Sequence, residues 1–90
     1  MKDFETYSDL ELSTALGSED SSIAKCAFDE LYNRYSKLVY TYCLRMLRNE
    51  DNAKDAFQDT FVKFLGAISK KETIDNLKAY LMKIAHNVCI

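Results

Sequence analysis

Residues 70–87 contain a group of side chains whose types suit contact with a nucleic acid. The group combines lysines with a tyrosine, a histidine and an asparagine, namely Lys70, Lys71, Lys78, Tyr80, Lys83, His86 and Asn87. Lysines bind phosphates as point charges, aromatic rings stack on exposed bases, and an asparagine amide hydrogen-bonds to a base edge. We therefore predict a DNA-binding surface here. The alternative is a solvated surface whose lysine stems cover apolar neighbours.

A second group of side chains suits a protein partner instead. Asp55, Gln58 and Asp59 recur at three- and four-residue steps, so they share one side of a helix. Large apolar residues, among them Phe61 and Leu65, lie next to them in the sequence. Carboxylates and an amide beside apolar surface fit a basic helical partner, and the alternative is a face that only keeps the chain in solution.

The sequence lacks the residue combinations that catalysis and metal binding need. Asp55 and Asp59 are four residues apart, but a carboxylate pair does acid–base work only in a cleft that shifts its pKa values. The single histidine has no partner at ligand spacing, and the cysteines are odd in number and far apart: Cys26, Cys43 and Cys89. We therefore predict no enzyme, no metal site, no cofactor and no disulfide, and we interpret Cys43 as a small buried hydrophobic residue.

The composition limits what can position these groups. The chain has 90 residues, of which 48% are hydrophobic and 29% are charged, with no proline and only 2 glycines. This length makes one domain, and a β-sheet fold would need many more turn residues, so we predict an all-α bundle. The chain has no run of about 20 apolar residues and no apolar N-terminal segment, which predicts a cytoplasmic protein without a membrane segment.

Charge is divided unequally along the chain. Residues 1–30 carry two basic and eight acidic side chains, whereas residues 31–90 carry ten basic and six acidic ones. Such polarity marks either a polyanion-binding half with an acidic cover or two solvated faces.

Hydrophobic periodicity predicts a short first helix and three longer ones, near residues 8–16, 23–48, 52–68 and 75–90. A capping box of Ser8 and Glu11 starts the first helix, and Gly17 ends it in the left-handed conformation. Asn49 takes the left-handed position after the second helix, Asp51 or Asn52 caps the third, and Thr73 or Asp75 starts the last. The apolar stripes must bury one another, which predicts this core: Phe28, Leu31, Tyr35, Val39, Phe57, Phe61, Phe64, Leu77, Leu81 and Ile84.

Three segments together resemble region 2 of the extracytoplasmic-function (ECF) sigma factors of the sigma-70 family. Residues 27–35 (AFDELYNRY) are similar to the opening of that region. Residues 52–61 (NAKDAFQDTF) resemble its central helix, often written A-x-D-x-x-Q-[DE]-x-F, and residues 77–87 (LKAYLMKIAHN) resemble its last helix, where W/Y-L-x-x-I-A-x-N recurs. The three segments occur in the family's order and cover nearly the whole chain from Ser8.

This resemblance implies a function for both groups of side chains. It implies that the central helix, with Asp55, Gln58, Asp59 and the neighbouring Phe61 and Leu65, docks on a coiled coil of the RNA polymerase β′ subunit. It also implies that the last helix and the loop before it recognise the −10 promoter element and hold its melted non-template strand. An anti-sigma factor that covers these faces is a further partner that the resemblance implies.

The chain also departs from the family pattern. Lys37 follows Ser36 where the family often has proline, Tyr80 stands where many members have tryptophan, and no aromatic residue lies near Ile74. The family's second domain, a helix-turn-helix that reads the −35 element, is absent, so we expect an excised region 2 that spans residues 1–90.

Two functions from other classes remain alternatives. One is a helical protein-interaction regulator, such as an adaptor or an anti-sigma-like protein, which would have no affinity for nucleic acid. The other is a small helix-turn-helix DNA-binding domain that uses residues 76–88 as a recognition helix and prefers intact duplex to single strands.

Overall fold

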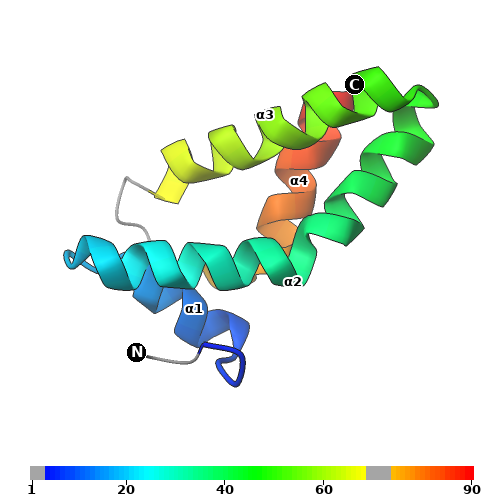
Figure 1. Ribbon diagram of the computed structural model, residues 1–90. Coiled ribbons are helices and arrows are strands. Elements are labelled where there is room, and N and C mark those ends of the chain that lie inside the picture. The colour runs from blue at the N-terminus through cyan, green and yellow to red at the C-terminus, as the bar shows by residue number, and fades with distance from the viewer. Residues whose placement is uncertain (1–3, 69–73) are drawn as a thin grey trace.

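The computed structural model describes residues 4–68 and 74–90. Within them it has four helices, α1 (Asp9–Leu16), α2 (Ser21–Leu47), α3 (Glu50–Ile68) and α4 (Leu77–Cys89), and no strand (Figure 1). This confirms an all-α fold with one short helix and three longer ones. None of the described helices combines the length and the apolar character that a membrane crossing needs.

The first helix begins as the sequence predicts and ends differently. The Ser8 hydroxyl accepts a hydrogen bond from the Glu11 amide (3.2 Å), and the Glu11 carboxylate accepts one from the Ser8 amide (2.9 Å), which confirms the capping box. Gly17 follows the last residue, but its φ of −85° is not left-handed, so that prediction is wrong. The Gly17 amide instead donates to the carbonyl of Thr14 (3.2 Å), a tight closing turn that right-handed backbone permits.

The junction between α2 and α3 also differs from its prediction. Arg48, and not Asn49, is left-handed, with a φ of 54°. The Asn49 side chain accepts a hydrogen bond from the Asn52 amide (2.9 Å), so Asn49 acts as the N-terminal cap in place of Asp51 or Asn52. An asparagine is a better cap than an arginine, which explains why the left-handed turn comes one residue earlier.

The starts of α2 and α4 are set by side-chain caps as well. The Asp20 carboxylate accepts from the Ser22 amide (2.9 Å) and begins α2 two residues before its predicted start. The Asn76 side chain accepts from the Ala79 amide (3.0 Å), so α4 begins at Leu77 and its cap is Asn76 and not Asp75. Thr73 itself lies outside the described residues.

The core is built from all four helices. Six of the ten predicted core residues are buried: Leu31, Val39, Phe61, Phe64, Leu77 and Leu81. The other four are only partly buried and pack around the core, namely Phe28, Tyr35, Phe57 and Ile84. Cys43 is fully buried, as predicted, and this burial raises its pKa to about 12, so it is a protonated thiol in the core.

The long helix α2 bends about midway, although it contains no proline (Figure 1). Its first half contacts α1, where the Arg34 guanidinium lies 3.0 Å from the Asp9 carboxylate. Its second half contacts α4, where the Tyr42 hydroxyl lies 2.8 Å from Nδ1 of His86. One helix therefore joins the N-terminal part of the chain to the last helix.

Arg34 of α2 holds the N-terminal segment in place by hydrogen bonds. It donates hydrogen bonds to two carboxylates and two backbone carbonyls, those of Asp9, Glu30, Phe4 and Glu5. The Tyr35 hydroxyl donates to the other oxygen of Asp9. Burial, and then the Asp9 carboxylate, raise the pKa of Tyr35 to about 12. This network lies on the α1 side of the molecule and holds Phe4 in the core.

Candidate functional site

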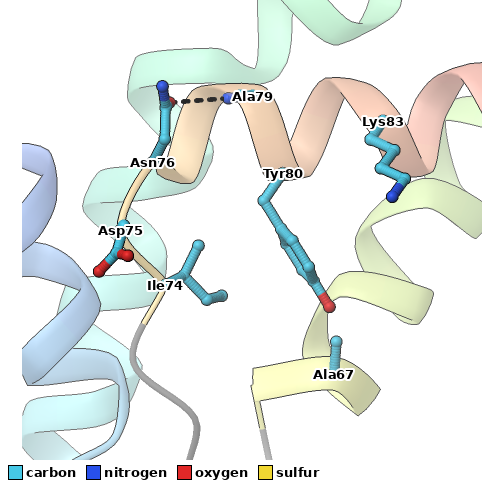
Figure 2. Close-up of a pocket in the computed structure, with 7 residues that line it drawn as sticks. All are labelled: Ala67, Ile74, Asp75, Asn76, Ala79, Tyr80 and Lys83. Carbon is cyan, nitrogen blue, oxygen red and sulfur yellow. Dashed lines mark hydrogen bonds between the residues drawn. The ribbon is translucent and has the colours of Figure 1, made fainter.

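Tyr80 is the centre of a groove between α3 and α4. Its ring packs edge-on against Phe64, with the ring centroids 6.1 Å apart, and remains half-buried. Two open cavities include it. One, of about 320 Å³, is lined by Lys63, Ala67, Tyr80, Ile84, Asn87 and Val88. The other, of about 350 Å³, is lined by Ala67, Ile74, Asp75, Asn76, Ala79, Tyr80 and Lys83 (Figure 2). We call the two cavities together the α3–α4 groove.

The α3–α4 groove brings together three of the predicted DNA-binding residues, Tyr80, Lys83 and Asn87. Figure 2 shows the Tyr80 side chain reaching from α4 towards Ala67 at the end of α3, with Lys83 on the same side of α4. Tyr80 offers a ring, Lys83 a positive charge and Asn87 an amide with both donors and an acceptor. This combination can hold a nucleotide by its base and its phosphate.

The other predicted DNA-binding residues lie elsewhere. Lys78 is exposed but precedes Tyr80 by two residues, about 200° around the helix, so it lies on the opposite flank of α4. His86 contacts Tyr42 of α2 and lines neither cavity. Lys70 and Lys71 lie outside the described residues. Among the described residues of the predicted DNA-binding surface, Tyr80, Lys83 and Asn87 therefore form one compact site, and Lys78 and His86 lie apart from it.

The residues of the groove that the sequence analysis missed include Lys63, Ile74 and Asp75. The amide of Ile74 donates to the Ser13 hydroxyl of α1 (2.9 Å), which fixes the segment before α4. Asp75 is among the lining residues, but Figure 2 shows its carboxylate pointing away from Tyr80 and Lys83. Lys63 lies on α3, and only the packing of α3 on α4 brings it to Asn87, so the sequence carried no signal for it.

A second surface covers the opposite flank of α3. Asp55, Gln58 and Asp59 are all exposed, as a docking surface requires. Beside them lies an apolar cavity of about 300 Å³ between α2 and α3, lined by Phe28, Tyr32, Phe57, Gln58, Phe61, Val62 and Leu65. We call this cavity the α2–α3 groove. It contains both apolar residues that the sequence suggested, although Phe61 is only 5% exposed and forms its floor.

The α2–α3 groove combines a floor of packed aromatic rings with exposed apolar rims. The ring centroids of Tyr32 and Phe61 are 5.0 Å apart, and those of Tyr32 and Phe57 are 5.8 Å apart. Val62 is 64% exposed and Leu65 is 44% exposed, so water covers apolar surface that a partner could bury. The sequence analysis missed Tyr32, which lies on another helix, and Val62, which interrupts the polar face of α3.

Residues 4–68 and 74–90 contain side chains that can ligate metal ions, but these are scattered. No three His, Cys, Asp or Glu side chains there come together as a metal site would require. Cys26, Cys43 and Cys89 are free thiols.

Comparison with known proteins agrees with this arrangement. Residues 31–90 match the family model for sigma-70 region 2. The chain is 31% identical over 64 residues to the RNA polymerase sigma factor YlaC of Bacillus subtilis (strain 168), which is 71% of this chain and 37% of that protein. The chain thus spans little more than a third of the relative's length, and no solved structure matches it. We conclude that the chain belongs to the sigma-70 family, as a region 2 domain.

Proposed function

We propose that this region 2 domain docks on the coiled coil of the RNA polymerase β′ subunit and holds the melted −10 promoter element. The observation that carries the proposal is the arrangement on α3. One flank presents carboxylates, an amide and an apolar groove, and the other presents Tyr80, Lys83 and Asn87 across the α3–α4 groove. A protein partner and a DNA strand can therefore bind at the same time.

The α2–α3 groove suits a helical partner with basic residues at its edge. Apolar side chains of the partner would cover Val62 and Leu65. This burial would stabilise the complex by about 25 cal/mol for each Å² of apolar surface that is removed from water. Asp55 and Asp59 would face lysine or arginine, which steers association and fixes register. Gln58 lines the groove and offers a donor and an acceptor where the apolar and charged parts meet.

The α3–α4 groove suits single-stranded DNA. Bases that leave the duplex would be trapped by contact with Tyr80 and by hydrogen bonds from Asn87, which offsets a few kcal/mol of unstacking. Lys83 would bind a phosphate, and Lys70, Lys71, Lys78 and His86 remain proposed contacts around this site. The mechanism is capture of an open strand, and it requires no enzymatic strand separation.

The charge of this region limits its affinity for DNA. Residues 70–90 carry four lysines against Glu72 and Asp75. Three or four phosphate contacts to a single strand predict a log–log salt slope of roughly −2 to −3. Binding by this domain alone is therefore weak, and we propose that it acts when the polymerase holds it on the promoter. An anti-sigma factor that covers either groove remains a proposed partner.

A pull-down of the β′ coiled-coil fragment by the 90-residue chain tests the docking. We expect retention by the wild type and clear loss with Gln58→Ala or Asp59→Ala, while the melting temperature stays nearly the same because both side chains are exposed. Normal retention by both variants would refute the docking surface.

Oligonucleotide binding separates the proposal from the two alternatives. We expect the chain to prefer a single-stranded −10 oligonucleotide to the matching duplex. A protein-interaction regulator would bind neither at low salt, and a helix-turn-helix domain would prefer the duplex.

A further inference from the structure

Lys63 lies at the boundary between the two surfaces of α3. Its ammonium group is 3.9 Å from the carboxylate of Asp59, one helical turn earlier, and the two side chains are 58% and 51% exposed. In the described part of the chain, Asp59 is the acidic group within ion-pair distance of Lys63. Lys63 also lines the cavity that contains Tyr80 and Asn87.

We propose that Lys63 is a phosphate-binding residue of the α3–α4 groove and that Asp59 competes with the phosphate for its ammonium group. This inference rests on the proposed function, which supplies the single strand. It adds a DNA contact from α3, whereas all the DNA contacts predicted from the sequence lie on the last helix or the loop before it.

The surroundings of Lys63 favour a phosphate over the ion pair. An exposed i, i+4 pair contributes little, because both charges are already solvated and the lysine loses side-chain freedom in the pair. A strand whose base contacts Tyr80 and Asn87 must carry its backbone along the rim of the groove, where Lys63 projects. Lys83 lines the neighbouring cavity, so the groove has a lysine on each of its two helices.

Asp59 lies where the two proposed binding surfaces meet. Its carboxylate belongs to the proposed polymerase surface and also neutralises Lys63. Removal of the Asp59 charge should therefore weaken binding of the β′ coiled coil and strengthen binding of DNA. A residue that only keeps the surface polar would not change the two affinities in opposite directions.

The test uses the 90-residue chain and a fluorescein-labelled single-stranded −10 oligonucleotide, with anisotropy measured at several salt concentrations near 0.1 M. We expect Lys63→Gln to weaken binding about five-fold and to make the log–log salt slope shallower by about 0.7, the value for one phosphate contact to a single strand. Lys54→Gln is the matched control. This variant removes the same charge from α3. Lys54 precedes Lys63 by nine residues, or about two and a half turns, so it lies on the opposite flank of the helix.

The second arm of the test removes the competing carboxylate. We expect Asp59→Asn to strengthen DNA binding about two- to four-fold, the size of a weak exposed ion pair. Asp55→Asn should have no such effect, because it lies about 12 Å from Lys63 along the helix axis, beyond the screening length of about 10 Å at 0.1 M salt. Circular dichroism checks that every variant is folded.

Each outcome decides a different claim. If the wild type binds the oligonucleotide and Lys63→Gln behaves like Lys54→Gln, the inference is wrong and the proposed function stands. If Asp59→Asn behaves like Asp55→Asn, Asp59 is not a competitor. If the wild type does not bind the single strand at low salt, the DNA part of the proposed function fails, and the Lys63 site fails with it.

Discussion

The side chains on the two flanks of α3 differ in chemical character. The flank towards α2 exposes apolar rims at Val62 and Leu65 over an aromatic floor, with carboxylates and an amide beside them. The flank towards α4 combines the ring of Tyr80 and aliphatic residues such as Ala67 and Ile84 with the polar groups of Lys63, Lys83 and Asn87. The first can gain affinity mainly by removing apolar surface from water, whereas the second adds charges and hydrogen bonds that water already satisfies.

Under the proposed function, this difference would let one helix contribute to a tight and to a weak binding surface. The α2–α3 groove has the properties of a stable interface, a rigid core surrounded by polar groups. The α3–α4 groove has those of a weak site that becomes effective when its ligand is held nearby. Phe64 lies between the flanks, fully buried, and supports Tyr80 from beneath.

The substitution Phe64→Ala should disturb both flanks of α3 and cause the greatest loss of stability. Phe64→Ala removes a fully buried ring and leaves a cavity between α3 and α4, which should lower the free energy of unfolding by about 3–5 kcal/mol. Urea unfolding followed by circular dichroism measures this loss. A loss below about 1 kcal/mol would show that Phe64 does not support the two helices as described.

The next effect breaks the α2–α3 groove alone. Leu65→Asp puts an unpaired charge into apolar surface that the polymerase coiled coil would cover, which should raise the Kd for that fragment about 30-fold, or about 2 kcal/mol. Oligonucleotide binding should not weaken beyond the small effect of one added negative charge. Leu10→Asp is the control, because Leu10 is 54% exposed on α1, outside the groove. Equal losses for the two variants would contradict a defined docking site.

A smaller effect comes from a region that belongs to neither flank. Tyr35→Phe removes the hydrogen bond to Asp9 and should cost about 1 kcal/mol of stability near neutral pH, with both partners still bound normally. The pKa of Tyr35 is about 12 in the folded chain and 10.0 ordinarily. The unfolded chain therefore loses this proton first, so the Tyr35 contribution is constant below pH 10 and falls as pH rises from 10 to 12.

Unfolding measured from pH 8 to pH 11 checks this dependence. The stability of the wild type should fall more steeply above pH 10 than that of Tyr35→Phe. Parallel curves would show that Tyr35 carries no such linkage.

Substitutions in the α3–α4 groove should have the smallest effects, and these separate the roles of Lys83 and Asn87. Lys83→Ala should weaken every oligonucleotide alike, by a few-fold, and make the salt slope shallower by somewhat under one unit. Asn87→Ala should instead remove the preference between −10 variants with little change in slope, because an amide contact carries sequence information and no charge. Equal losses on matched and scrambled oligonucleotides for Asn87→Ala would reject its role in specificity.

Sequence alone predicted most of the fold because the apolar stripes are long and regular. The bounds of all four helices were predicted to within two residues, and the Ser8–Glu11 capping box was correct because it depends on neighbours in the sequence. The left-handed residue at the end of α2 was misplaced because Asn49 was needed as a cap for α3. Local rules each favoured Asn49, but only one of its two roles could be met.

The candidate site was predicted less well, for a physical reason. Asp55, Gln58 and Asp59 lie on one helix, so their common exposure follows from spacing alone. The α3–α4 groove joins Lys63 to Asn87 across two helices, and the α2–α3 groove joins Tyr32 to Leu65 in the same way. No periodicity within a single helix encodes such pairs.

One measurement tests most directly whether α3 carries two separate binding surfaces. The ¹⁵N-labelled chain is titrated with the β′ coiled-coil fragment and, in a second sample, with the single-stranded −10 oligonucleotide, while amide chemical shifts are recorded. We predict that the fragment shifts the amides of Tyr32, Val62 and Leu65, and that the oligonucleotide shifts those of Tyr80, Lys83 and Asn87. If both partners shift the same set, or if neither set responds, α3 does not carry two separate binding surfaces.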